Sequence, residues 1–390
     1  MVLKDRYLTL NLRHSAKTIN IVSAIPSTQA SFGCTHLCKN TLTFGSFRFA
    51  CENIFPNSDL HRQDTLVIDT YKQDSLAEES PSLTMDRPCP SPSVCVVIPT
   101  YNRPDRLHAC LEALCLQTLP TSQFEVVVVD DGSRDSMLTV VEIFRDCLNV
   151  KLVRQENSGP AKARNHGVKE SRADLIAFTD DDCRPRPDWL GSLLETESRY
   201  PGAMVGGTTI NGLPDKAFSS ASQFVLDLVY HHFNSDPLHS YFLTTNNMLC
   251  RRSAILEVGG FDVRFSKAAE DRDFCDRWRS SGRRIVWTKD ATIDHFHSQS
   301  LTGFIGLHFR YGIGAYEYQA KRRRQGKTME DDISFHRSLI GYLRTDLFRR
   351  FGILGGLRML VLLMIWQVTN TLGFFYASIM GRSDGKSPTE

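Results

Sequence analysis

The chain has 390 residues, of which 41% are hydrophobic and 23% charged. This composition allows a sizeable apolar core and excludes disorder throughout the chain. The 23 phenylalanines follow no fixed period, which excludes a fibrous repeat. A formal net charge of only +2 gives no support for a nucleic-acid partner.

Residues 1–92 show no sustained periodicity, and they end in a Ser/Pro-rich stretch with four prolines between residues 75 and 93. Such a stretch favours an extended linker, so we predict a poorly ordered N-terminal extension and linker here. Met85 is a candidate natural start. No apolar run near residue 20 is long enough for a secretory signal.

The 11 cysteines include no Cys-x-x-Cys pair, which predicts reduced thiols in a reducing, cytosolic compartment.

From Val94 onward, apolar strand-like runs alternate with helical spacing. The predicted strands are 94–98, 126–129, 151–153 and 175–178, and the predicted helices are 104–117, 135–146 and 160–169. This alternation indicates βαβ units and a parallel sheet. The second half is more mixed, with predicted strands at 204–210, 247–250 and 284–287 and predicted helices at 217–232, 270–280 and 301–324.

Polar clusters follow three of the predicted strands. They are Thr100-Tyr101-Asn102, Asp130-Asp131 and Asp180-Asp181-Asp182. Because the carboxyl ends of parallel strands meet at one edge of a sheet, we expect these clusters to form a common binding site.

The acidic run after the strand 175–178 has the pattern Asp-x-Asp. Carboxylate oxygens suit Mg²⁺ or Mn²⁺, with substrate phosphates completing the coordination shell. A metal bound there would neutralise a departing diphosphate. The alternative is a solvated acidic turn or a helix cap. Asp130 and Asp131 have the same ambiguity, since they could accept hydrogen bonds from a nucleotide or cap the next helix.

Glu270 and Asp271 begin a predicted helix, where acidic residues either complement the helix dipole or supply a general base. His295 is a candidate third metal ligand, although surface histidines in turns are common. Asn246-Asn247 could touch an acceptor or only close a turn. The sequence has no glycine-rich phosphate loop, so neither a nicotinamide fold nor a nucleoside triphosphatase is supported.

Residues 93–297 resemble glycosyltransferase family 2, because five motifs occur in the order typical of that family. They are VIPTYNR at 97–103, VVDDGS at 128–133, ARNHG at 163–167, FTDDD at 178–182 and ED at 270–271. The resemblance implies a GT-A fold, an α/β architecture whose Rossmann-like, mostly parallel central sheet is flanked by helices. It also implies inverting transfer of a sugar from a nucleoside-diphosphate-sugar donor to an acceptor hydroxyl.

The resemblance assigns roles to individual residues. Asp271 would be the catalytic base, with Glu270 beside it. Asp182 would hold Mn²⁺ or Mg²⁺ directly, and Asp180 would face the ribose or a metal-bound water. Asp180 and His295 stay further candidate metal ligands from the residue pattern. The residues implied to contact the nucleotide-sugar are Pro99, Thr100, Tyr101, Asn102, Asp130, Asp131, Arg164, Asp180 and Asp181.

Processive synthases of this family carry a Gln-x-x-Arg-Trp motif and many membrane spans. Here Phe274 occupies the Gln position before Arg277-Trp278, so we predict a non-processive enzyme.

Two alternatives to a glycosyltransferase remain. A sugar nucleotidyltransferase usually has a glycine-rich loop after its first strand, and 99–104 contains no glycine. A non-catalytic nucleotide-sugar-binding membrane protein would have no reason to keep Asp180, Asp182 and Asp271. The acceptor class stays open between a glycan, a lipid and a small molecule.

Residues 359–381 contain no charged residue, and about 20 apolar residues span a bilayer. The polar stretch 367–371 opposes a simple span, and the two shorter apolar pieces could instead lie in the interface or form a re-entrant hairpin. Residues 321–358 hold ten Lys/Arg against four acidic residues. This excess predicts contact with membrane lipids and a cytoplasmic catalytic domain. The alternative is a buried helix of a soluble domain.

The predicted organisation therefore has a GT-A domain at 93–300, a basic helical region at 301–350, a hydrophobic membrane-associated segment at 351–381 and a tail at 382–390. The pattern YGIGA at 311–315 also resembles family members whose catalytic domain is followed by membrane-associated helices. Removal of residues 351–390 is expected to release an active soluble domain.

Overall fold

The computed structural model describes residues 93–328, 330–342 and 346–383, together with five N-terminal strands. These are β1 (Arg6–His14), β2 (Lys17–Ile25), β3 (Cys34–Cys38), β4 (Thr41–Phe44) and β5 (Phe47–Ala50). They pair antiparallel as β1–β2 and as β3–β4–β5, and the sequence pattern did not predict them. The Ser/Pro-rich linker lies outside the described residues, so its extended state stays a prediction. Residues 1–85 and 86–390 form separate units.

The larger unit is built on an eight-stranded sheet with the order β10-β13-β11-β12-β9-β6-β7-β8. Its strands are β6 (Val94–Thr100), β7 (Phe124–Asp130), β8 (Val150–Arg154), β9 (Leu175–Phe178), β10 (Cys183–Pro185), β11 (Met204–Asn211), β12 (Met248–Arg251) and β13 (Ile285–His295). The pairs β9–β6, β6–β7, β7–β8 and β11–β13 are parallel, and the other three are antiparallel. The predicted, mostly parallel sheet is confirmed.

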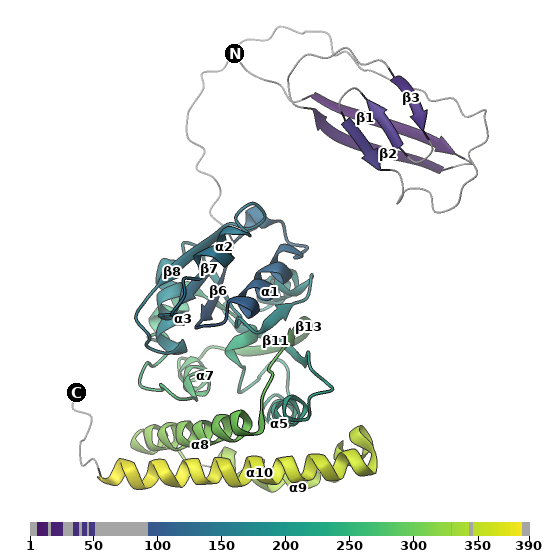
Figure 1. Cartoon of the computed structure of the whole chain (residues 1–390). Helices are drawn as coiled ribbons and strands as arrows, with labels where there is room; N and C mark the ends of the chain where they lie inside the picture. Colours follow the sequence, from purple (N-terminus) through teal and green to yellow (C-terminus); the bar gives the residue numbers. More distant parts are fainter. Residues whose placement is uncertain are drawn as a thin grey trace. The chain divides into compact units, whose positions relative to one another are not determined.

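Helices cover both faces of this sheet (Figure 1). They are α1 (Pro104–Cys115), α2 (Leu138–Glu142), α3 (Pro160–Glu170), α4 (Trp189–Arg199), α5 (Ala217–Phe233), α6 (Arg252–Glu257) and α7 (Glu270–Ser280). The side chains of β6 alternate between two cores. Val96 and Ile98 pack in the core that contains α1 residues, whereas Cys95 and Val97 pack in the core that contains α3 residues. This double burial explains the continuous apolar runs of the central strands.

The polar clusters meet at one edge of the sheet, as predicted. Thr100 pairs in register with Asp130, and Val97 pairs with Phe178 at the end of β9. Two differences from the sequence expectation matter for the site. Strand β13 runs on to His295 instead of ending at residue 287, and the three-residue β10 pairs with it. Cys183 of β10 lies opposite His295, which brings the acidic run beside that histidine.

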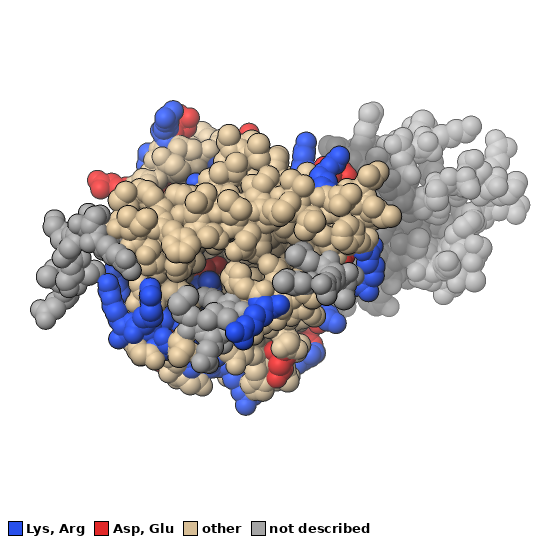
Figure 2. Space-filling model, turned by 90° about the horizontal axis from the view of Figure 1, so that it is seen from below, with Lys and Arg blue, Asp and Glu red and all other residues tan. Residues whose placement is uncertain are grey.

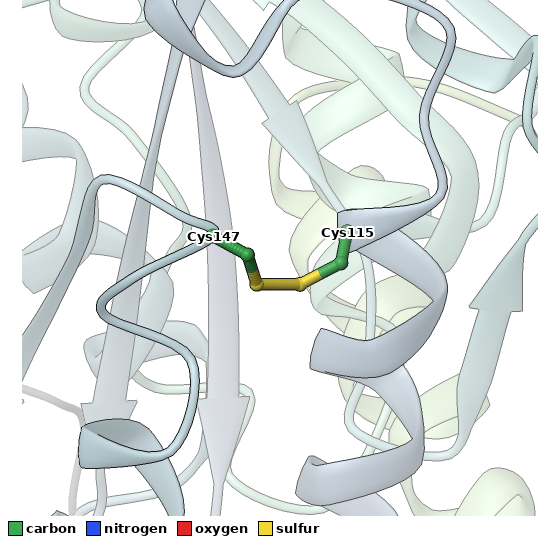
Figure 3. Close-up of a disulfide and its surroundings, with 2 residues drawn as sticks. All are labelled: Cys115 and Cys147. Atoms are coloured by element: carbon green, nitrogen blue, oxygen red, sulfur yellow. A yellow bond between two sulfur atoms is a disulfide. The ribbon is translucent and has the colours of Figure 1, made fainter. Parts of the chain in front are cut away.

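Cys115 and Cys147 form a disulfide between the end of α1 and the turn before β8 (Figure 3). The expectation that every cysteine is a reduced thiol is therefore wrong for this pair. Among the residues with described side chains, Cys95, Cys110, Cys183, Cys250 and Cys275 are free and buried. The cysteines as a group no longer argue for a reducing compartment.

Three helices follow the sheet: α8 (Leu301–Arg324), α9 (Glu330–Tyr342) and α10 (Phe348–Ser383). Helices α8 and α10 lie side by side beneath the α/β domain (Figure 1). Helix α10 is interrupted at Gly352, where φ is 67°, and it continues from there as one helix. The two apolar pieces of the C-terminal segment therefore do not fold back as a re-entrant hairpin.

One side of α10 belongs to the protein core. Met359, Leu362, Leu363 and Trp366 are buried in a cluster with residues of α5 and α8. Removing residues 351–390 would expose this cluster to water, at a cost of about 1.5–3 kcal/mol for each large side chain. The packing contradicts the expectation that this segment can be deleted to leave an active soluble domain.

Glycines bring α8 against its neighbours on two sides. A Cβ atom at Gly312 would lie 2.0 Å from the carbonyl oxygen of Asn370 in α10. A Cβ atom at Gly314 would lie 2.5 Å from the carbonyl oxygen of Ala268, just before α7. Both distances are far below van der Waals contact, so each close approach requires glycine. The YGIGA pattern is thus a packing motif.

The opposite side of α10 is exposed and apolar. The exposed side chains recur every three or four residues along the helix: Leu354, Leu357, Val361, Met364, Val368, Leu372, Phe375 and Ile379. We call this set the α10 stripe. Figure 2 shows the face that carries α10 as a broad area without Lys, Arg, Asp or Glu, with basic side chains around its edge. A hollow with charged side chains inside opens on the same face.

Candidate active site

The loops after β6 and β7 are tied together by hydrogen bonds. The backbone N–H of Asn102 donates to the Ser133 hydroxyl at 2.8 Å, and the Arg134 N–H donates to the Asn102 side chain at 2.8 Å. Asn102 has a φ of 54°, in the left-handed region that Asn tolerates better than most residues. Tyr101 beside it is 47% exposed, whereas Thr100 is buried. The Pro99–Asn102 segment thus forms a fixed rim of the site.

Asp130 and Asp131 both accept hydrogen bonds from loop backbone. The Ser133 N–H donates to Asp130 at 2.9 Å. The N–H groups of Ser158 and Gly159, just before α3, donate to Asp131 at 2.9 and 2.8 Å. Neither aspartate caps the next helix, α2, whose N-cap is Met137, so the capping alternative is wrong. Their bonds instead hold the loop after β7 and the loop before α3 in place. A carboxylate oxygen can accept more than one bond, so their predicted contact with a nucleotide stays a prediction.

The three aspartates after β9 point to different partners. Asp180 pairs with Arg164 of α3 at 2.7 Å. Asp181 accepts hydrogen bonds from the Thr100 hydroxyl at 2.8 Å and from Arg103 at 3.1 Å. Burial raises the pKa of Asp181 to about 6, with Arg103 opposing that rise. Asp181 is therefore part of the internal bracing between β6, α1 and β9.

Asp182 lies among basic groups. One of its carboxylate oxygens, Oδ2, is 2.9 Å from Arg106 and 3.7 Å from His297 Nδ1. The other, Oδ1, is 3.3 Å from His295 Nε2. Burial by itself would raise the pKa of Asp182, but the two histidines and Arg103 outweigh it and hold that pKa well below its usual value. In turn, Asp182 raises the pKa of His295 despite the burial of the imidazole.

This geometry fits a hard or borderline divalent cation. Asp182, Cys183 and His295 place potential ligand atoms within 4.8 Å of one another. A carboxylate with an imidazole is a donor set that Mn²⁺ accepts and Mg²⁺ tolerates. Sulfur is a soft donor that neither Mn²⁺ nor Mg²⁺ favours, which leaves Asp182 and a neutral His295 as the donors. The other predicted ligand, Asp180, is engaged by Arg164, whereas His297, which was not predicted, lies beside Asp182.

Glu270 and Asp271 begin helix α7 after a strained residue. Ala269 has a φ of 77°, which costs a non-glycine residue about 1–2 kcal/mol. Arg164 pairs with Glu270 at 3.1 Å and with Asp180 at 2.7 Å, so it joins the start of α7 to the acidic run. Burial and the neighbouring Glu270 raise the pKa of Asp271 to about 7. A carboxylate with this pKa is suited to general-base chemistry near neutral pH.

A cavity of about 950 Å³ connects this cluster to the C-terminal helices. Its polar end is lined by Arg164, Asp180, Glu270, Asp271, His295 and His297. Its other walls come from α5, α8, α9 and α10. Gln367, Asn370 and Thr371 of α10 line it too, which explains the polar stretch in an otherwise apolar helix.

The comparisons with known proteins agree with this geometry. The model of the family described as glycosyl transferase family 2 matches residues 95–259. Residues 95–259 are a glycosyltransferase family 2 domain. The sequence of the chain is similar to glycosyltransferase AglE of Haloferax volcanii, with 29% identity over 60% of this chain and 72% of the relative. It is also similar to the pre-mycofactocin glycosyltransferase of Mycobacterium tuberculosis, with 32% identity over 59% of this chain and 48% of the relative.

A solved structure supports the fold. The mannosyltransferase PcManGT from Pyrobaculum calidifontis, in complex with GDP-Man and Mn²⁺, matches with a TM-score of 0.55 and 19% sequence identity, covering 76% of this chain and 88% of that chain. The predicted GT-A fold is therefore confirmed. At this level of identity the likeness concerns the fold, and the donor and metal of this family 2 glycosyltransferase are argued below from its own residues.

Sequence reasoning missed several residues of the site in this glycosyltransferase. Arg103 and Arg106 bind the acidic run, but on the sequence they are only two charges at the start of a helix. Nothing in the sequence signals the strained conformation of Ala269. Of the Asn246-Asn247 pair, Asn247 is buried and accepts a hydrogen bond from Trp189 at 2.8 Å, so it is structural. Asn246 lines the cavity.

Proposed function

We propose that this glycosyltransferase transfers a sugar from a nucleoside-diphosphate-sugar donor to an acceptor hydroxyl, with inversion at the anomeric carbon. The observation that supports this most is Asp271, a buried carboxylate with a raised pKa in the wall of a large cavity. In this proposal Asp271 takes the proton of the acceptor hydroxyl as that oxygen attacks the anomeric carbon. The diphosphate leaves from the opposite face, so one displacement inverts the configuration.

The neighbouring residues position the base. Arg164 holds Glu270, and through it the first turn of α7, against Asp180. Because Arg164 is thereby neutralised on both sides, it does not lower the pKa of Asp271 as far as a direct ion pair would. Glu270 is accordingly a positioning residue beside the base.

Asp182 and His295 would hold Mn²⁺ or Mg²⁺ in this proposal, and a bound metal would supply positive charge to the leaving diphosphate. The ring of Arg103, Arg106 and the two histidines keeps Asp182 ionised in a buried place, which is the state a metal ligand requires. The Mn²⁺ complex of PcManGT is consistent with this assignment.

The donor class is tested by the product released. We expect the purified full-length chain with Mn²⁺ to release nucleoside diphosphate from one member of a panel of nucleoside-diphosphate sugars. A sugar nucleotidyltransferase would instead consume nucleoside triphosphate and release pyrophosphate. A non-catalytic binding protein would give neither product with any donor, and either result would contradict the proposal.

We also propose that the enzyme binds the membrane surface through α10. The length and composition of residues 348–380 would suit a span, but α10 packs along α8 with its polar groups facing the cavity. A helix with one packed side and one exposed apolar side is suited to lying in the plane of the interface. Helix α10 carries Arg349, Arg350, Arg358 and Arg382 and no acidic residue, which favours anionic lipids and a cytoplasmic face.

Introducing charge into the α10 stripe is expected to release the enzyme from membranes. The double variant Leu357→Asp/Met364→Asp removes two exposed apolar side chains without touching the buried side of α10. Losing about 1.5 kcal/mol for each residue predicts a roughly 100-fold lower partition into anionic vesicles, measured by co-sedimentation. Leu256→Asp/Val263→Asp is the matched control, since those side chains are also exposed but lie on other elements. Equal binding by both double variants would contradict an α10 interface.

A further inference from the structure

The cavity has two chemically different parts. Beyond the catalytic carboxylates, part of its wall is apolar and aromatic, formed by residues of α5, α8, α9 and α10. They include Leu226, Val229, Phe233, Leu307, Phe335 and Trp366. The loops after β6 and β7, which are proposed to contact the nucleotide, are not among the described residues that line this cavity, so a nucleotide bound there would not cover this wall. The apolar part therefore needs a hydrocarbon partner.

Cationic side chains also line the cavity. Besides Arg164, they are Lys267, Arg272, Arg279, Arg322 and Arg337. The acidic side chains that line it are Asp180, Glu270, Asp271 and Asp276. Arg164 pairs with Asp180 and Glu270, and Asp276 pairs with Lys327 at 2.8 Å and with Arg322 at 3.5 Å. Six cationic side chains against four acidic ones give the described lining of the cavity an excess of positive charge, which an anionic group would complement.

Aromatic rings fix the orientation of two of these arginines. The Arg279 guanidinium lies 3.6 Å from the centre of the Tyr241 ring, and the Arg272 guanidinium lies 4.8 Å from that of Tyr318. Stacked guanidinium groups are preorganised, so less side-chain entropy is lost when they bind an anion. Arg272 directly follows Asp271, which places this charge next to the base.

A buried histidine in the cavity wall points to a ligand as well. His308 is 2% exposed, and neither of its ring nitrogens has a hydrogen-bond partner among the described residues. Its ring is held between Phe304 and Tyr311, with centroid distances of 4.4 and 5.6 Å. An unpaired buried polar group is costly, and a bound molecule with a hydroxyl or phosphate oxygen would satisfy it.

We propose that the acceptor is an anionic amphiphile, in which the reacting hydroxyl belongs to a head group joined through a phosphate to a hydrocarbon chain. The hydroxyl would meet Asp271, the phosphate would lie among the cationic side chains, and the first carbons of the chain would follow the apolar wall. The hollow on the face that carries α10 gives such a chain a route to the lipid (Figure 2). This inference rests on the proposed glycosyl transfer and adds the class of acceptor.

Calorimetric titration of the full chain with dodecyl phosphate below its micelle concentration tests the inference. We expect saturable binding at least about tenfold tighter than that of dodecanol or of inorganic phosphate. The variant Arg279→Gln should weaken dodecyl phosphate about tenfold, and Arg279→Lys should restore part of the loss. Arg145→Gln is the control, because that exposed arginine lies after α2 and pairs with Glu142. Equal affinity for dodecanol, or no effect of Arg279→Gln, would overturn the proposal.

Two further measurements separate this site from others. Leu357→Asp/Met364→Asp should keep dodecyl phosphate binding, and its loss there would show that the probe only coats α10. Binding of dodecyl phosphate should persist with saturating nucleoside diphosphate and Mn²⁺, and its displacement would show that the probe's phosphate occupies the donor site.

The two proposals fail in different ways. A chain that binds nucleoside diphosphate but not dodecyl phosphate refutes the acceptor class alone. A chain that binds no nucleoside diphosphate with Mn²⁺ refutes the proposed function.

Discussion

Replacing Asp271 by Asn is expected to lower kcat by about 10²–10⁴-fold, the usual contribution of a positioned general base. The amide keeps the shape of the side chain but cannot take the acceptor proton. Donor affinity should change little, since Asp271 acts on the acceptor. Measuring kcat together with nucleoside-diphosphate binding checks both parts. Parallel losses in turnover and donor binding would remove Asp271 from the role of base.

The pH profile gives an independent check of the same residue. Burial and Glu270 raise the pKa of Asp271 to about 7, while Arg164 and Arg272 oppose the rise. A base works only when deprotonated, so kcat should increase with pH up to about 7 and then level off. This limb of the profile should be absent from the residual activity of Asp271→Asn. A profile that is flat from pH 5 to 8 in the unmodified enzyme would contradict the assignment.

Removing divalent metal is expected to abolish transfer, because nothing would then neutralise the negative charge that develops on the leaving diphosphate. A loss of several kcal/mol of charge stabilisation corresponds to about 10³-fold or more in rate. Activity should disappear in a chelator and return when Mn²⁺ or Mg²⁺ is added in excess. Full activity in the chelator would show that Asp182 and His295 hold no catalytic metal.

Substitution of the metal ligands sharpens that test. Asp182 is buried among Arg106, His295 and His297, so Asp182→Asn leaves these basic groups uncompensated and risks misfolding. His295→Gln is the milder variant. It should weaken Mn²⁺ binding, measured by electron paramagnetic resonance, and raise the Mn²⁺ concentration needed for half-maximal activity. An unchanged Mn²⁺ affinity would exclude His295 as a ligand.

The central sheet could be predicted because burial on both faces leaves a clear signal. The runs at Val94–Ile98 and Val126–Val129 are continuous and apolar, and the polar residues that follow them meet at one edge as expected. The short strand β10 could not be predicted, since three residues carry no periodicity. Its pairing with β13 nevertheless brings Asp182 to His295, so the proposed metal site depends on a contact that local sequence does not encode.

Helix α10 shows a different limit of prediction from sequence. Hydropathy identified an apolar segment, but it could not separate the side that packs on α5 and α8 from the side that stays exposed. The polar stretch around Asn370 opposed a membrane span on the sequence, and the structure explains it through the cavity. The disulfide between Cys115 and Cys147 was missed because such pairing depends on tertiary distance.

The two glycine contacts of α8 have a mechanical consequence. Gly312 and Gly314 are two residues apart, so they face about 200° apart around the helix. One side touches α10 and the other touches Ala268, next to the strained turn that carries the base. At both contacts backbone packs against backbone, with no flexible side chain between them. Helix α8 therefore holds α10 at a fixed distance from the turn before α7. A bilayer that sets the tilt of α10 would also set the direction from which an acceptor approaches Asp271.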